Sequence, residues 1–161
     1  MKSGPLGAAL SAALLLASPV LAQEQGAGAL AAGVRRIPPE RLGNYWLLIP
    51  ESAQANVPNS GYGLDAPTCV AVSYVVEKNG TTSHVKIEKA VPQGPLGKVA
   101  FNVVSGMRFA NAAQNAGKDP VATYVVMPFN VPEAASTKPA DKATRERVLA
   151  PCQLADFVPA K

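Results

Sequence analysis

Two alternating apolar stretches around a Lys-Asn-Gly turn constrain the fold more than any other feature of this sequence. Every second residue from 70 to 76 is apolar or aromatic, and Val85 and Ile87 continue the alternation after the turn. Lys78, Asn79 and Gly80 supply the residue types that adopt the positive φ angles of a tight hairpin. The pattern therefore predicts a β-hairpin whose first strand turns one face inward, formed by Val70, Val72, Tyr74 and Val76.

A helix and one further strand follow the hairpin. Pro95 can open a helix because its missing N–H is not needed in the first turn, and apolar residues then recur at helical spacing: Leu96, Val99, Ala100, Val103 and Met107. In residues 121–131, alternate positions again form an apolar face, with Ala122, Tyr124 and Val126 opposite. The sequence predicts an α+β fold in the order β-β-α-β. We expect a three-stranded antiparallel sheet with one helix packed on a face and the second face partly exposed to water.

Residues 1–22 have the features of an export signal. Lys2 gives a positive start, residues 6–16 are apolar, and Val20 and Ala22 occupy the small-residue positions of a cleavage site. The apolar run is shorter than the roughly 20 residues that a spanning helix needs. We therefore expect cleavage after Ala22, a periplasmic location and no membrane span in the mature chain. The alternative is an uncleaved N-terminus that anchors the protein in the inner membrane.

The remaining chain divides into three parts by composition. Residues 23–48 form a Gly- and Ala-rich leader followed by a docking segment that carries Trp46, residues 49–131 form the domain, and residues 132–161 form a polar tail. The only cysteines are Cys69 and Cys152. In an oxidising compartment a disulfide is favoured over metal ligands, a nucleophile or two buried thiols. Such a bond would tie the tail back to the start of the first strand.

Side chains that carry catalysis or hold metals are sparse. His84 is the only histidine, and its neighbours place it on the exposed face of a strand, so an activated nucleophile has no obvious base. A structural metal site usually needs four ligands, and there is no close Cys pair. The net charge of +4 is spread along the chain without stacking aromatics, which argues against nucleic-acid binding. We expect a protein that is not an enzyme, uses no cofactor and works by binding.

The order of these elements resembles the C-terminal domain of the TonB family. Residues 70–80 (VAVSYVVEKNG) look like that family's first strand and turn, and residues 107–112 (MRFANA) stand where it usually has Trp-[Arg/Lys]-Phe-x-Pro-Ala. Residues 117–121 (GKDPV) match its Gly-x-x-Pro-Val, and residues 127–131 (MPFNV) resemble its closing strand. Residues 49–53 (IPESA) are similar to its earlier Tyr-Pro-x-x-Ala element.

The resemblance implies a periplasmic binding module associated with transmembrane transport. It implies that the last strand pairs by β-augmentation with an extended segment of an envelope partner, such as an outer-membrane TonB-dependent transporter. The residues implicated are Val121, Ala122, Thr123, Tyr124, Val125 and Val126. The alternative is a structural or cell-wall-associated envelope protein that uses the same fold without transporter coupling. Homodimer formation is left open.

Overall fold

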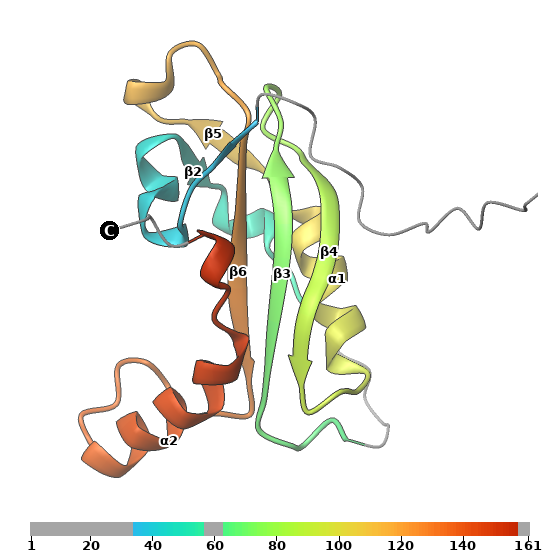
Figure 1. Ribbon diagram of the computed structural model, residues 1–161, viewed down its shortest axis with the longest axis vertical. Coiled ribbons are helices and arrows are strands. Elements are labelled where there is room, and N and C mark those ends of the chain that lie inside the picture. The colour runs from blue at the N-terminus through green and yellow to red at the C-terminus, as the bar shows by residue number, and fades with distance from the viewer. Residues whose placement is uncertain (1–33, 57–62, 158–161) are drawn as a thin grey trace, which may run out of the picture.

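The structure is a computed structural model that describes residues 34–56 and 63–157. The predicted export signal, residues 1–22, lies outside the described residues, as does most of the leader. The described chain is a mixed α+β fold (Figure 1). Its larger sheet has four strands in the order β1-β6-β3-β4. Their bounds are β1 (Arg35–Arg36), β6 (Val121–Phe129), β3 (Thr68–Val76) and β4 (Thr82–Val91).

The predicted hairpin is confirmed as the antiparallel pair β3–β4. Gly80 has a φ angle of 79°, and a Cβ at this position would clash with the carbonyl of Phe109, so the turn requires glycine for two reasons. The Asn79 side chain accepts hydrogen bonds from the main-chain N–H and the hydroxyl of Thr81, at 3.1 and 2.8 Å. These contacts fix the turn that the sequence specifies.

The first face of the sheet packs against the helix α1 (Leu96–Gly106). Val70, Val72, Tyr74 and Val76 of β3 turn toward this side, as predicted, and Val121 of β6 joins them. The helix contributes its predicted apolar stripe, in which Val99, Ala100 and Val103 are buried, and Val104, which lies outside that stripe, is buried as well. The two sequence periodicities therefore identify the β3 residues and most of the helix residues of this core, but not Ile37, Val104 or Phe109.

The second face is covered over β3 and the start of β6, whereas the Lys86 side chain of β4 on that face is 51% exposed, so the face is partly exposed to water, as expected. A C-terminal segment crosses it, formed by α2 (Pro139–Leu149), η4 (Ala150–Cys152) and η5 (Ala155–Phe157). A second apolar cluster lies beneath this segment and comprises Cys69, Ala71, Val75, Ala122, Tyr124, Cys152, Leu154 and Phe157. Both faces of β3 are buried as a result, with only Ser73 half-buried among its nine residues.

The predicted disulfide between Cys69 and Cys152 is present, with the two Cα atoms 6.1 Å apart. It joins the start of β3 to η4 and so holds the polar tail on the sheet. The tail has few apolar residues of its own, since α2 buries none of its side chains. The covalent link therefore explains how a polar segment supplies the cover of an apolar face.

A two-stranded sheet adds to the expected architecture. It pairs β2 (Trp46–Leu48) with β5 (Phe109–Asn111) in antiparallel register. Trp46 is 2% exposed, and its indole N–H donates to the carbonyl oxygen of Asp119 at 3.0 Å. The expected three-stranded sheet is thus corrected to one sheet of four strands and one of two. Short 3₁₀ turns complete the fold: η1 (Pro39–Asn44), η2 (Pro50–Ser52) and η3 (Ala113–Asn115).

Candidate functional site

The six residues that the sequence singles out lie at the start of β6, between β3 and β1. Val121 and Ala122 pair in parallel with Arg35 and Arg36 of β1. The main-chain N–H of Ile37 then donates to the carbonyl oxygen of Ala122 at 2.9 Å. The chain's own N-terminal strand therefore occupies the first part of the edge that the resemblance assigns to a partner.

Strand geometry decides which other residues on β6 could pair with a partner. Main-chain groups of successive residues point to opposite edges of a strand. Because Ala122 faces β1, Tyr124 and Val126 also face away from β3, whereas Thr123 and Val125 face β3. Tyr124 is only 4% exposed, and its ring lies 5.1 Å from that of Phe157. Of the six residues, Val126 alone is half-buried with its main chain turned outward.

The opposite edge of the sheet is β4, and no described strand pairs with its outer side beyond Thr81. On β3, Val70 and Val72 turn their main-chain groups toward β6. Their partners on β4, Ala90 and Ile87, therefore turn theirs outward. Most side chains from residue 84 to residue 91 are exposed, so a second extended segment can reach these groups.

The β4 edge is apolar on the face that it shares with α1. Ile87 is 39% exposed, and its Cδ1 atom lies 3.6 Å from the position that a Cβ on Gly97 would take. The strand therefore approaches the helix closely at this glycine. Phe101 follows Gly97 by one helical turn, on the same side of α1, and is 36% exposed. Ile87 and Phe101 are exposed apolar side chains beside an open edge.

The same edge is charged on the other face. The Lys86 ammonium lies 2.9 Å from the Glu88 carboxylate, which also accepts a hydrogen bond from the Ser73 hydroxyl at 2.7 Å. The Lys89 ammonium donates to the carbonyl oxygen of Gln153 at 2.9 Å. Partial burial of Glu88 opposes its ionisation, but the contacts with Ser73 and Lys86 outweigh burial and hold the pKa of its carboxyl below its usual range.

Two irregularities interrupt the β3–β4 pairing. The register shifts between Ala71 and Val72 and again between Ser73 and Val75. Near the second shift, His84 adopts a φ angle of 49°, which is unusual for a residue with a side chain. Bulges of this kind bend an edge and restrict which strands can pair with it. The two bulges therefore limit the length of regular backbone that an added strand could follow on this edge.

One polar cluster on the hairpin contains serine, histidine and a carboxylate. The Ser83 hydroxyl hydrogen-bonds to the Glu77 carboxylate and lies 2.9 Å from Nδ1 of His84. In a catalytic triad the carboxylate instead orients the histidine, which then acts on the nucleophile. The carboxylate here contacts the serine, so His84 is not oriented as a base. Within residues 34–56 and 63–157, no group of three His, Cys, Asp or Glu side chains could hold a metal ion.

Two of the segments that carry the TonB resemblance lie side by side. In the 49–53 segment, the Ile49 main-chain N–H donates to the carbonyl oxygen of Arg108 at 2.8 Å. The Ser52 hydroxyl oxygen accepts a bond from the Arg108 main-chain N–H, also at 2.8 Å. This juxtaposition of segments 56 residues apart was not predicted. Short strands such as β2 and β5 have too little alternation to reveal it.

No protein-family model matches the chain, and no curated protein matches it. In the described part of the chain, no helix has both the length and the apolar character needed to cross a membrane.

Proposed function

We propose that the protein is a periplasmic, TonB-like binding module that pairs with an extended segment of an envelope partner, such as an outer-membrane transporter, and so takes part in transmembrane transport. The observation that carries this proposal is the open edge of β4, where Ile87 and Ala90 turn unpaired main-chain groups outward beside exposed apolar side chains. Main-chain pairing supplies affinity in β-augmentation, and flanking side chains supply selectivity.

The β4 edge supports this function better than the β6 edge suggested by the resemblance. On β6, the chain's own β1 pairs with the first two residues, and Tyr124 is buried. Pro128 further reduces the free part of that edge because it has no N–H to donate. On β4, the exposed run from residue 86 to residue 89 leaves room for an added strand.

The two faces of β4 specify the kind of segment that fits. An added strand would place alternate side chains above and below the sheet. Side chains on the α1 face would contact Ile87 and Phe101, so apolar residues fit there. Side chains on the other face would contact Lys86, Glu88 and Lys89, so polar or charged residues fit there. The partner segment is therefore extended and amphipathic, with a two-residue period.

Substitutions of Ile87 separate main-chain pairing from side-chain contact. Extended decapeptides selected from a random displayed library serve as the probe. Ile87→Pro removes the outward N–H, whereas the matched variant Ile87→Ala keeps it and shortens only the side chain. We expect Ile87→Pro to weaken peptide binding about tenfold or more, and Ile87→Ala to weaken it by a factor of about two to five.

Val126→Pro provides the comparison with the other edge, since Val126 turns its N–H outward on β6. Peptide binding should change less than about twofold in this variant. Undiminished binding to a folded Ile87→Pro protein would remove β4 from consideration, and loss of binding in Val126→Pro would return the site to β6. Pull-down from envelope extracts then identifies the partner class. Recovery of cell-wall material instead of transporters would favour the structural alternative.

A further inference from the structure

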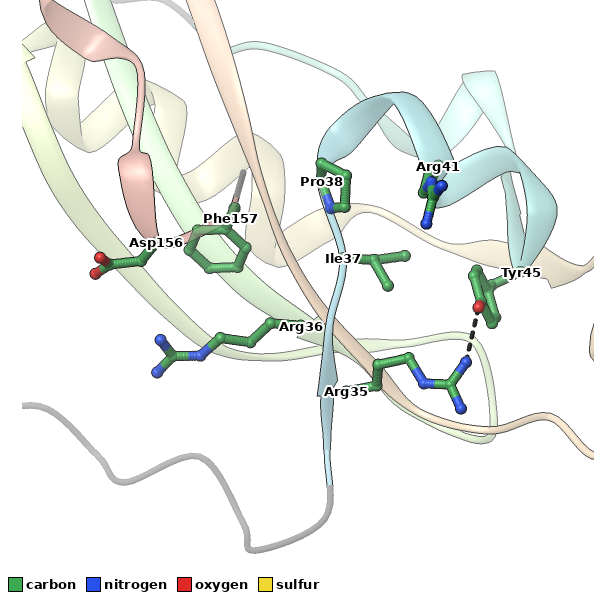
Figure 2. Close-up of a pocket in the computed structure, with 8 residues that line it drawn as sticks. All are labelled: Arg35, Arg36, Ile37, Pro38, Arg41, Tyr45, Asp156 and Phe157. Atoms are coloured by element: carbon green, nitrogen blue, oxygen red, sulfur yellow. Dashed lines mark hydrogen bonds between the residues drawn. The ribbon is translucent and has the colours of Figure 1, made fainter. Parts of the chain in front are cut away.

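A pocket of about 200 Å³ lies at the opposite edge of the sheet, between β1, η1 and η5. Its charged lining residues are Arg35, Arg36, Arg41 and Asp156. Figure 2 shows Arg35 and Arg36 leaving β1 in opposite directions. Arg35 points toward Tyr45, on the same side of Ile37 as Arg41, whereas Arg36 points toward Asp156 and Phe157. The lone carboxylate of the lining is therefore on the side away from Arg35 and Arg41.

Aromatic residues hold two of the guanidinium groups in place. The Arg35 guanidinium donates a hydrogen bond to the Tyr45 hydroxyl at 2.9 Å and lies 5.8 Å from the centre of the Tyr45 ring. The Arg36 guanidinium lies 5.8 Å from the centre of the Phe157 ring. Each arginine keeps further N–H donors free after these contacts, because a guanidinium has five. Restraint of this kind lowers the entropy cost of binding an anion.

The three guanidinium groups form no ion pair with a carboxylate of the described residues, and Glu88 acts on Arg36 only at longer range. Within the described residues, the ion pair found within 4.0 Å joins Lys86 and Glu88. No carboxylate oxygen of these residues therefore lies within 4.0 Å of the guanidinium groups of Arg35, Arg36 or Arg41. Positive groups held near one another repel, and an anion bound between them would relieve that repulsion. On the Tyr45 side, Arg35 and Arg41 together carry two positive charges that face no carboxylate of the pocket lining.

We propose that this pocket binds a phosphate monoester group. Two guanidinium groups match the charge of a dianion better than that of a single carboxylate, and their planar arrays of donors suit phosphate oxygens. Pockets that enclose a whole small molecule usually measure about 300–1,000 Å³, so a volume of about 200 Å³ suits a terminal group of a larger ligand. This site is independent of the β4 edge, because β1 and β4 are the two outer strands of the sheet.

Methyl phosphate is the probe that tests the site, titrated into the full mature protein at about pH 7.5, where phosphate monoesters are dianions. Calorimetry gives the affinity, and the NMR signals of the arginine Nε–H groups report which side chains respond. We expect saturable binding that weakens about tenfold or more in Arg41→Gln. Arg147→Gln is the matched control, because Arg147 is an exposed arginine of α2 outside the pocket, and it should change affinity less than about twofold.

Acetate tests the preference for a dianion and should bind about tenfold or more weakly than methyl phosphate. The proposal is overturned by an absence of saturable binding, by equal loss in Arg41→Gln and Arg147→Gln, or by equal affinity for acetate. Phosphatidylcholine vesicles with and without phosphatidic acid distinguish the source of the group. Co-sedimentation that requires both phosphatidic acid and Arg41 assigns a lipid headgroup, and methyl phosphate binding without co-sedimentation assigns a soluble ester.

Discussion

The disulfide between Cys69 and Cys152 joins residues 83 positions apart and fixes the C-terminal segment on the second face of the sheet. Cys69 is the second residue of β3 and lies on the side opposite α1, and Cys152 ends η4. Leu154 and Phe157 follow the bond and pack over Ala71, Val75, Ala122 and Tyr124. The bond thus lies beside the apolar cluster that the segment covers, and Phe157 of the same segment also lines the arginine pocket.

Removal of this bond should destabilise the fold strongly. In the chain-entropy model, closing a loop of this length contributes about 4 to 5 kcal/mol to the free energy of unfolding. We expect the double variant Cys69→Ala, Cys152→Ala to unfold at a lower urea concentration, by an amount that corresponds to this loss in the free energy of unfolding. Thiol counting on unreduced, denatured protein should find no free thiols. Equal midpoints for the two proteins would show that the tail covers the sheet without the bond.

A buried hydroxyl in the centre of β6 predicts an unusual gain in stability. Thr123 is fully buried, and its Oγ1 atom has no hydrogen-bond partner among the described residues. Replacing it by the near-isosteric valine removes a desolvated polar group, so Thr123→Val should raise the free energy of unfolding by about 1 kcal/mol. Denaturant titration measures the change.

Thr82→Val is the matched control for that substitution. The Thr82 hydroxyl donates to the carbonyl oxygen of Val104 at 2.8 Å and links the start of β4 to α1. The same chemical change should therefore lower the free energy of unfolding by about 1 kcal/mol. If Thr123→Val is destabilising by a similar amount, then its hydroxyl has a partner, such as an internal water.

Local sequence patterns account for the centre of the fold. The two-residue period of β3 and β6 identifies their inward faces, and Asn79 with Gly80 identifies the turn. The cysteine count, together with the expected oxidising compartment, predicts the disulfide. These features are predictable because each depends on a few neighbouring residues. The disulfide also predicts that the tail returns to the start of β3, but not that the tail covers the second face, because α2 is polar and buries none of its side chains.

The candidate site was less accessible to sequence reasoning. Whether a strand lies at an edge depends on the order of strands in space, and β1 is only two residues long with no apolar alternation. Nothing in Arg35 and Arg36 indicates that they pair with Val121 and Ala122. The arginine pocket could not be predicted for the same reason. Arg35, Arg36 and Arg41 lie far from Phe157 in the sequence and come together with it only in the folded chain. Trp46, with its apolar neighbours Leu47 and Leu48, was the local sequence sign that this segment docks.

Gly80 should tolerate no side chain. Its φ angle of 79° disfavours residues with a side chain, and a Cβ here would clash with the carbonyl oxygen of Phe109. The main-chain N–H of Phe109 also donates a hydrogen bond to the carbonyl oxygen of Gly80, so the two segments are held close together. We expect Gly80→Ala to lower the free energy of unfolding by about 2 to 4 kcal/mol, because strain and overpacking add. Gly43→Ala, where nothing lies within 4 Å of the added Cβ, should be neutral or stabilising by up to about 1 kcal/mol. Similar midpoints for the two variants in thermal or urea denaturation would contradict this account of the turn.

The Glu88 carboxyl on β4 should make the stability of the fold depend slightly on pH in the acid range. Because contacts with Ser73 and Lys86 lower its pKa in the folded state, its contribution to stability is present above the unfolded pKa of about 4.3 and is lost as the pH falls through the folded pKa. The Glu88 side chain is 27% exposed and Lys86 is 51% exposed, so solvent screening limits the effect to less than about 1 kcal/mol. Glu88→Gln should therefore destabilise the protein slightly at about pH 7 and have a smaller effect at about pH 3. Urea midpoints of both proteins at the two pH values provide the measurement, and a constant difference between them would show that Glu88 acts through packing and not through its charge.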